Sequence, residues 1–210
     1  MKVTPKIKST SMSEKTTNGI PEVKQRPGRK PVIPSPELGM ILFICTEVMF
    51  FTALISAFLV IKAGAGNWVP PEDVRLPILA TSVNTCFLII SGLLMLMAGR
   101  LYKEKETRDR AVEAYLRSTI LGAIFVCFQG WEWVQLVQYG FTMQAGIFAA
   151  TFFLVIGSHG LHAAATVIAM IWHYRGIKKH ALTMSGFRAL QYFWLFVVCI
   201  WPILFGLVYF

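Results

Sequence analysis

Charged residues are scarce in this sequence, and acidic ones most of all. Asp and Glu number 11 against 20 Lys and Arg, and charged types make up only 15% of the 210 residues. Hydrophobic types reach 55%, and they gather in runs of about 20 residues, the length that a helix needs to cross a bilayer. This composition excludes an ordinary soluble globular domain. We therefore interpret the chain as a polytopic membrane protein.

Cysteine and histidine are also rare, with four of each. The cysteines fall singly in four apolar segments and form no C-x-x-C pair, which excludes a zinc site or redox dithiol of that type. We expect them to be small buried hydrophobic residues. His159 and His162 lie three residues apart in one apolar segment, and so on one helix face. Such a pair binds metal in some proteins and hydrogen-bonds neighbouring helices in others. Since no further ligand stands at a recognisable spacing, we expect no metal site.

Five apolar segments are long enough to cross the hydrocarbon core of a membrane. Backbone groups in lipid must be satisfied within the segment, so we predict helices, and the pattern lacks the alternation of a β-barrel. The expected fold is all-α, a bundle of five transmembrane helices. The predicted spans are 38–61, 76–101, 116–137, 145–172 and 187–210.

Basic residues lie almost entirely on one side of these spans. The N-terminal segment and the second and fourth connections together hold 18 of the 20 Lys and Arg. The positive-inside rule then predicts a cytoplasmic N-terminus and a periplasmic C-terminus. Charge placed in this way indicates no nucleic-acid partner. We expect residues 1–36, basic and Pro-containing, to be disordered or docked on a partner, and residues 37–210 to form the membrane domain.

One carboxylate lies deep in the first span, Glu47 in the stretch Cys-Thr-Glu-Val-Met-Phe-Phe at 45–51. Ionisable groups in hydrocarbon are costly, so Glu47 is a candidate functional residue. On a helical wheel it shares its side with bulky residues, and small residues lie roughly 100° away. Small residues favour close helix packing, and here they are Gly39, Thr46, Ala53 and Ala57. We expect Glu47 to face lipid or a lipid-filled cleft, protonated and without an ion-pair partner.

A second carboxylate, Glu132, lies near the outer end of the third span. It stands in Gln-Gly-Trp-Glu-Trp at 129–133. Tryptophans at this depth are ordinary interfacial anchors, so Glu132 either reaches lipid headgroups or is a hydrogen-bonded carboxylate that faces a neighbouring helix. The sequence leaves both interpretations open.

These motifs resemble those of cytochrome c oxidase subunit III. Residues 39–51 are similar to the helix that bears the family's buried glutamate, and Gly157-x-His159-Gly160-Leu161-His162 follows in the family's order. The resemblance covers about residues 38–210 and implies the five-helix bacterial form. The chain looks like a divergent member, since Leu195 and Val198 replace the family's usual His and Asp in the last helix.

The resemblance implies a non-redox accessory subunit of a respiratory haem–copper oxidase, with no active site of its own. By the same resemblance it lies in the bacterial inner membrane, binds phospholipids, and supports oxygen reduction, proton uptake and proton pumping by the catalytic subunit. Haem and copper belong to partner subunits. Subunit I is the main expected contact, within the oxidase or a larger respiratory supercomplex. The resemblance also assigns residues: the buried glutamate is Glu47, a lipid-headgroup arginine is Arg175, and the structural polar network is Gln129, Glu132, His159 and His162.

Two other functions fit the same sequence. One is an accessory membrane protein of a nitric-oxide reductase, which would share the fold. The other is an independent carrier or channel, although the spans show neither a broken helix nor a charged pore-lining stripe. The catalytic oxidase subunit is excluded, because two intramembrane histidines are too few to ligate its haems and copper.

Overall fold

The computed structural model describes residues 35–65, 78–178 and 184–209. It contains five α-helices and two short 3₁₀ turns. The helices are α1 (Ser35–Gly64), α2 (Ile78–Leu101), α3 (Arg108–Gln138), α4 (Ile147–Lys178) and α5 (Met184–Tyr209). All five are long and apolar enough to cross a membrane, and the described residues form no strand. The predicted all-α fold with five transmembrane helices is therefore confirmed.

Two parts of the sequence-based prediction remain predictions. The basic segment 1–36 lies almost wholly outside the described residues, because the description begins at Ser35. The cytoplasmic and periplasmic placement of the two ends rests on loop charge alone.

The largest boundary difference is at the start of α3, which begins eight residues before the predicted span. Hydropathy misses this part because it carries charged residues on its outer side, where Arg117 pairs with Glu113. Its inner side is apolar and buried, and the Tyr115 hydroxyl donates to the Met170 carbonyl of α4 at 3.0 Å. Packing on one face thus extends the helix beyond its apolar run.

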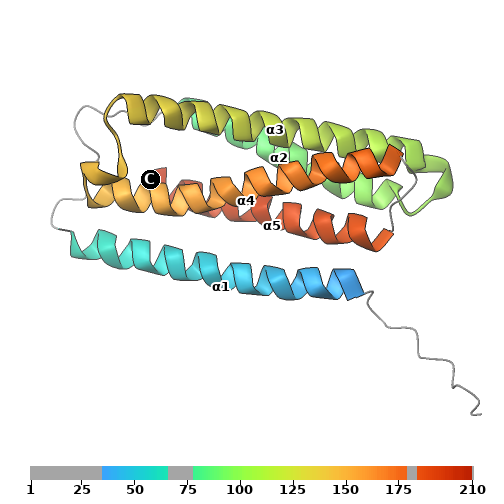
Figure 1. Ribbon diagram of the computed structural model, residues 1–210, viewed down its shortest axis with the longest axis horizontal. Helices are drawn as coiled ribbons and strands as arrows, with labels where there is room; N and C mark the ends of the chain where they lie inside the picture. Colours follow the sequence, from blue (N-terminus) through green and yellow to red (C-terminus); the bar gives the residue numbers. More distant parts are fainter. Residues whose placement is uncertain (1–34, 66–77, 179–183, 210) are drawn as a thin grey trace, which may run out of the picture. The chain divides into compact units, whose positions relative to one another are not determined.

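Consecutive helices run in opposite directions (Figure 1). Helices α2 and α3 pack along their length, and α5 contacts α1, α2 and α4. The largest fully buried side chains of the bundle include Trp194 and Trp201, both on α5. Helix α5 therefore carries much of the core.

Glycines allow α5 to approach its neighbours closely. A Cβ at Gly122 of α3 would lie 2.7 Å from the Trp194 ring, and one at Gly92 of α2 would lie 2.9 Å from Val198. Small residues at such crossings are what helix packing in membranes selects, since apolar side chains gain little by leaving lipid.

Side-chain hydrogen bonds tie α5 to α2. The Trp201 indole donates to Thr85 Oγ1 at 2.8 Å, and the Trp194 indole donates to Ser91 Oγ at 3.1 Å. Ser91 also exchanges hydrogen bonds with Ser118 of α3. These bonds satisfy polar groups inside the bundle, where water is excluded.

Helix α1 packs inside the chain through a different face from the one expected. The small residues Gly39, Thr46, Ala53 and Ala57 are exposed, whereas the bulky Phe51 and Phe58 are buried. The predicted small-residue seam is therefore wrong. The reason is that α1 meets aromatic side chains rather than a neighbouring backbone, as in the Phe51–Phe196 contact at 6.0 Å between ring centroids.

The four cysteines are free and exposed on the outside of the bundle. Their expected burial within the chain is therefore wrong. A small apolar side chain loses little by facing lipid, so hydrophobicity alone does not place it inside a membrane protein.

Candidate functional site

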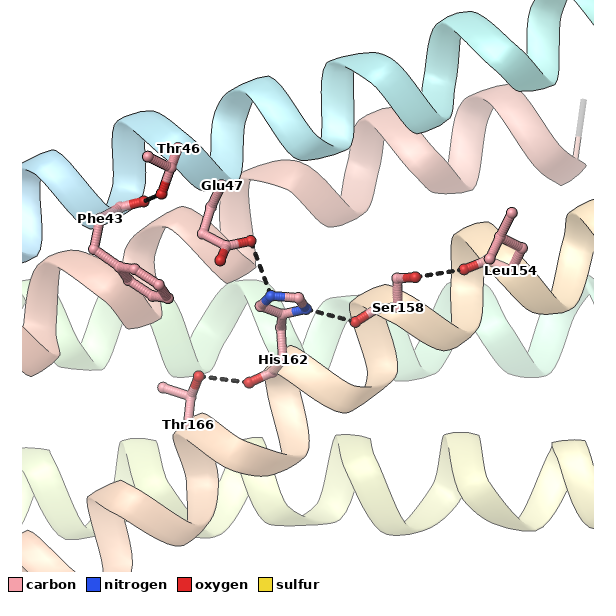
Figure 2. A network of polar contacts seen from close by, with 7 residues as sticks. All are labelled: Phe43, Thr46, Glu47, Leu154, Ser158, His162 and Thr166. Carbon is pink, nitrogen blue, oxygen red and sulfur yellow. Dashed lines mark hydrogen bonds and ion pairs between the residues drawn. The ribbon is translucent and has the colours of Figure 1, made fainter.

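Glu47 and His162 form a pair between α1 and α4 (Figure 2). Glu47 Oε2 lies 3.0 Å from His162 Nε2, and the two side chains are 14% and 20% exposed. The other ring nitrogen, His162 Nδ1, lies 2.7 Å from the Ser158 carbonyl oxygen one turn earlier on α4. The expectation that Glu47 has no partner is therefore wrong.

The contacts of the His162 ring determine which of its nitrogens carries a hydrogen. A carbonyl oxygen only accepts, so His162 Nδ1 must carry a hydrogen and donate it to Ser158. Nε2 can then face Glu47 in two ways: a protonated carboxyl donates to a bare nitrogen, or an imidazolium donates to a carboxylate. The two forms hold the same number of protons and differ in which residue carries the shared one. The pair is a neutral unit overall in both.

Local helix geometry positions the pair. Ser158 stands four residues before His162, where its carbonyl meets the imidazole, and its hydroxyl donates to Leu154. The ring also packs edge-on against Phe51 of α1, with centroids 5.3 Å apart. Nothing in the sequence links Glu47 with His162, 115 residues apart, so only the tertiary fold reveals the pair.

An apolar groove adjoins this pair. It has a volume of about 420 Å³ and is lined by residues of α1, α4 and α5. His162 forms part of its wall. The other lining residues are Met40, Phe43, Leu161, Ala165, Thr166, Ala169, Leu190 and Phe193. The pair therefore lies beside a surface suited to hydrocarbon.

A second polar cluster ties α3 to α2. The buried carboxylate of Glu132 accepts hydrogen bonds from Thr81 Oγ1 at 3.1 Å and from Gln129 Nε2 at 3.2 Å. This is the arrangement of a hydrogen-bonded carboxylate that faces a neighbouring helix. The sequence did not predict Thr81 as a partner of Glu132, because a single threonine at the start of an apolar span has no distinguishing pattern.

His159 does not join His162. It is 1% exposed and lies against Trp201, with ring centroids 4.9 Å apart. Within the described residues it makes no side-chain hydrogen bond. The expectation of one network through both histidines is wrong for direct contacts, because His162 turns towards α1 and His159 towards α3 and α5.

The remaining predicted residue is Arg175. It lies near the end of α4 and is exposed, and its role at a lipid headgroup stays a prediction. Among the described residues, no group of three or more His, Cys, Asp and Glu is arranged to hold a metal ion.

Comparison with known proteins identifies relatives of this chain. Residues 28–210 match the family described as Cytochrome c oxidase subunit III. The chain is 31% identical to the probable cytochrome c oxidase subunit 3 of Nocardia farcinica (strain IFM 10152), over 82% of this chain and 86% of that one. It is 32% identical to cytochrome c oxidase subunit 3 of Rhipicephalus sanguineus, over 82% and 69%, and 28% identical to that of Thermostichus vulcanus, over 82% and 85%.

Proposed function

The chain belongs to the cytochrome c oxidase subunit III family, and from that premise we propose that it supports proton uptake and lasting turnover by the oxidase's catalytic subunit. Family membership and the five apolar helices make it a multi-pass accessory subunit associated with other oxidase subunits. We place it in the bacterial inner membrane against subunit I, in an oxygen-reducing, proton-pumping complex or a supercomplex containing it. Haem and copper reside in the partner subunits.

The observation that carries the proton-related part is the Glu47–His162 pair. A hydrogen bond across their 3.0 Å contact needs one hydrogen between the two groups, on the carboxyl or on the imidazole, and the net charge of the site is the same in both forms. A neutral unit of this kind avoids much of the cost of an isolated charge in hydrocarbon. We infer that it serves as a proton-holding group beside the catalytic subunit, not as a catalytic residue.

The apolar groove supports the lipid-binding part of the proposal. Its volume of about 420 Å³ and its aliphatic and aromatic walls suit phospholipid acyl chains. Exposed Arg175, near the end of α4, offers a guanidinium that can pair with a phosphate. A lipid with its acyl chains in the groove and its phosphate on Arg175 would cover the side of α4 on which His162 lies.

The test is Glu47→Gln in the intact complex. A glutamine amide still hydrogen-bonds to His162 but exchanges no proton, so we expect normal assembly together with faster activity loss during turnover or a lower proton stoichiometry. Glu132→Gln is the matched control, since it changes another buried carboxylate in the same bundle. Wild-type decay and wild-type stoichiometry in the Glu47 variant would show that the pair has no part in proton handling.

A further inference from the structure

The imidazole of His162 is the one ionisable side chain among the residues that line the apolar groove. Thr166 is the other polar residue of the lining, and its hydroxyl donates to the His162 carbonyl of its own helix at 2.6 Å. Both ring nitrogens of His162 are engaged, Nε2 with Glu47 and Nδ1 with the Ser158 carbonyl. The part of the ring left to contact the groove is therefore carbon, in keeping with an apolar wall.

The two forms of the Glu47–His162 pair depend differently on that contact. With the hydrogen on the Glu47 carboxyl, both groups are uncharged. With the hydrogen on His162 Nε2, a carboxylate faces an imidazolium, whose positive charge is spread over the whole ring, carbon atoms included. The charge-separated form loses more than the neutral form when hydrocarbon replaces water beside the ring.

Water and hydrocarbon favour opposite forms of such a pair. Free in water, a glutamic acid is about 100-fold more acidic than an imidazolium, so the hydrogen prefers the imidazole. In apolar surroundings a carboxyl is harder to ionise and an imidazole is harder to protonate, and both effects move the hydrogen to the carboxyl. Glu47 and His162 are 14% and 20% exposed, between these two limits. The medium in the groove therefore has leverage on the balance.

The size and walls of the groove suit an acyl chain. Phe43 and Leu161 of its wall are 46% and 71% exposed, so they leave apolar surface to be covered. The lining on α4 runs from Leu161 to Ala169, about 12 Å at ~1.5 Å per residue. A helix of that length, about 10 Å across, would occupy roughly 900 Å³. The groove offers about 420 Å³, which excludes a whole helix and leaves room for a thinner hydrocarbon chain.

We propose that a phospholipid acyl chain in the groove determines which member of the pair carries the shared hydrogen. With the chain present, hydrocarbon covers the His162 ring, the O–H bond of Glu47 stays formed and Nε2 is bare. With water in the groove, that O–H bond breaks, the same proton forms an N–H bond at Nε2, and an ion pair results. No proton enters or leaves the pair. This coupling rests on the lipid-binding part of the proposed function and makes the groove a regulatory site.

The direct test is nitrogen-15 spectroscopy of the histidine rings in the full-length chain. The chain has only four histidines, and His162→Gln assigns the His162 signals by their loss. The chain is measured in cholate, a detergent without an alkyl tail, and again after saturation with phosphatidylcholine, whose headgroup adds no net charge. We expect the ratio of protonated to bare Nε2 to fall by about tenfold or more, a part of the ~100-fold preference that water confers. An unchanged or rising ratio would overturn the proposal.

A filled groove should reproduce the effect of lipid. Ala165 is exposed and lines the groove three residues from His162, so Ala165→Leu places fixed hydrocarbon beside the imidazole. In cholate alone this variant should already have a bare Nε2 and should respond less to lipid. Ala53→Leu is the matched control, because Ala53 is exposed on α1 and does not line the groove. Equal effects of the two variants, or no effect of Ala165→Leu, would overturn the proposal.

These measurements separate the coupling from the proposed function. Glu47→Gln in the intact complex tests whether the pair supports turnover, whereas the nitrogen-15 signal reports only where the hydrogen lies. A lipid-dependent signal with wild-type turnover in Glu47→Gln would support the coupling and remove its part in proton handling. A lipid-independent signal with impaired turnover would overturn the coupling and leave the proposed function standing.

Discussion

Removing His162 should destabilise the bundle more than removing both members of its pair. In His162→Leu, the Glu47 carboxyl keeps its place in apolar surroundings, 14% exposed, but loses its partner at 3.0 Å. A buried polar group left unsatisfied costs about 1–3 kcal/mol, and more if it stays charged. Glu47→Leu leaves His162 Nε2 bare in the same way.

The double variant Glu47→Leu/His162→Leu removes both polar groups at once. Replacing both partners by apolar side chains is often nearly neutral, so we expect most of the single-variant loss to be recovered. The coupling energy in the cycle should be about 1–3 kcal/mol, within the range for residues in contact.

The assay is reversible unfolding of the isolated chain in mixed micelles, followed by tryptophan fluorescence with rising denaturing detergent. Thr46→Val is the control partner, since among the described residues its hydroxyl bonds only to the Phe43 carbonyl of its own helix, and the residue is exposed. Thr46→Val should add independently to His162→Leu. If the double Leu variant instead loses the sum of both single losses, the Glu47–His162 contact does not stabilise the bundle.

Three further predictions concern the packing of α1 and α5. Gly122→Leu should lower the free energy of unfolding by about 1–3 kcal/mol, because the added side chain overpacks against Trp194. Gly130→Ala has open space around its new Cβ, so it should be neutral or slightly stabilising in the same unfolding assay. Trp201→Phe should lower the free energy of unfolding by about 1 kcal/mol or more, because Thr85 Oγ1 loses its donor. In a chain that already carries Thr85→Val, Trp201→Phe should have a much smaller effect. The same effect in both backgrounds would contradict the hydrogen bond. Arg188→Ala should lower the free energy of unfolding by at most about 1 kcal/mol, since its contact with Glu37 is 3.6 Å long and the arginine is partly exposed. A much larger loss would mean that Arg188 stabilises the bundle by more than its ion pair with Glu37.

The number and type of the helices followed from the sequence because bilayer thickness imposes a length on each apolar run. The ends were less certain where a helix continues outside hydrocarbon, as at Arg108, because burial there involves one face and hydropathy averages over all faces. Motif resemblance identified the family, and the comparison confirmed it.

The face of α1 that packs inside the chain was predicted wrongly for a physical reason. Small residues indicate where a helix can approach another closely, but not whether a given chain supplies that partner. Here Phe51 lies against His162 of α4 and Phe196 of α5, and Phe58 is buried, while Ala53 and Ala57 stay exposed. Glu47 lies on the bulky side of α1, which was expected to face lipid. That side packs against α4 instead, and this is why its partner His162 was missed.

The sequence predicted which residues belong to the site better than which of them are in contact. Intramembrane Glu47, Glu132, His159 and His162 stand out because each is costly in hydrocarbon. Which of them meet depends on how α4 rotates between α1 and α3, and helical spacing alone placed both histidines together. In the structure, His162 contacts Glu47 and His159 packs against Trp201.

The central claim is that this chain works as an accessory subunit of an oxygen-reducing complex. The most direct test is to purify it through its own affinity tag in mild detergent and record the subunits, the visible spectrum and the gas consumed. We predict haem absorption, an oxidase catalytic subunit in the preparation, and oxygen reduction. A colourless homo-oligomer, or a coloured complex that reduces nitric oxide but not oxygen, would contradict the claim.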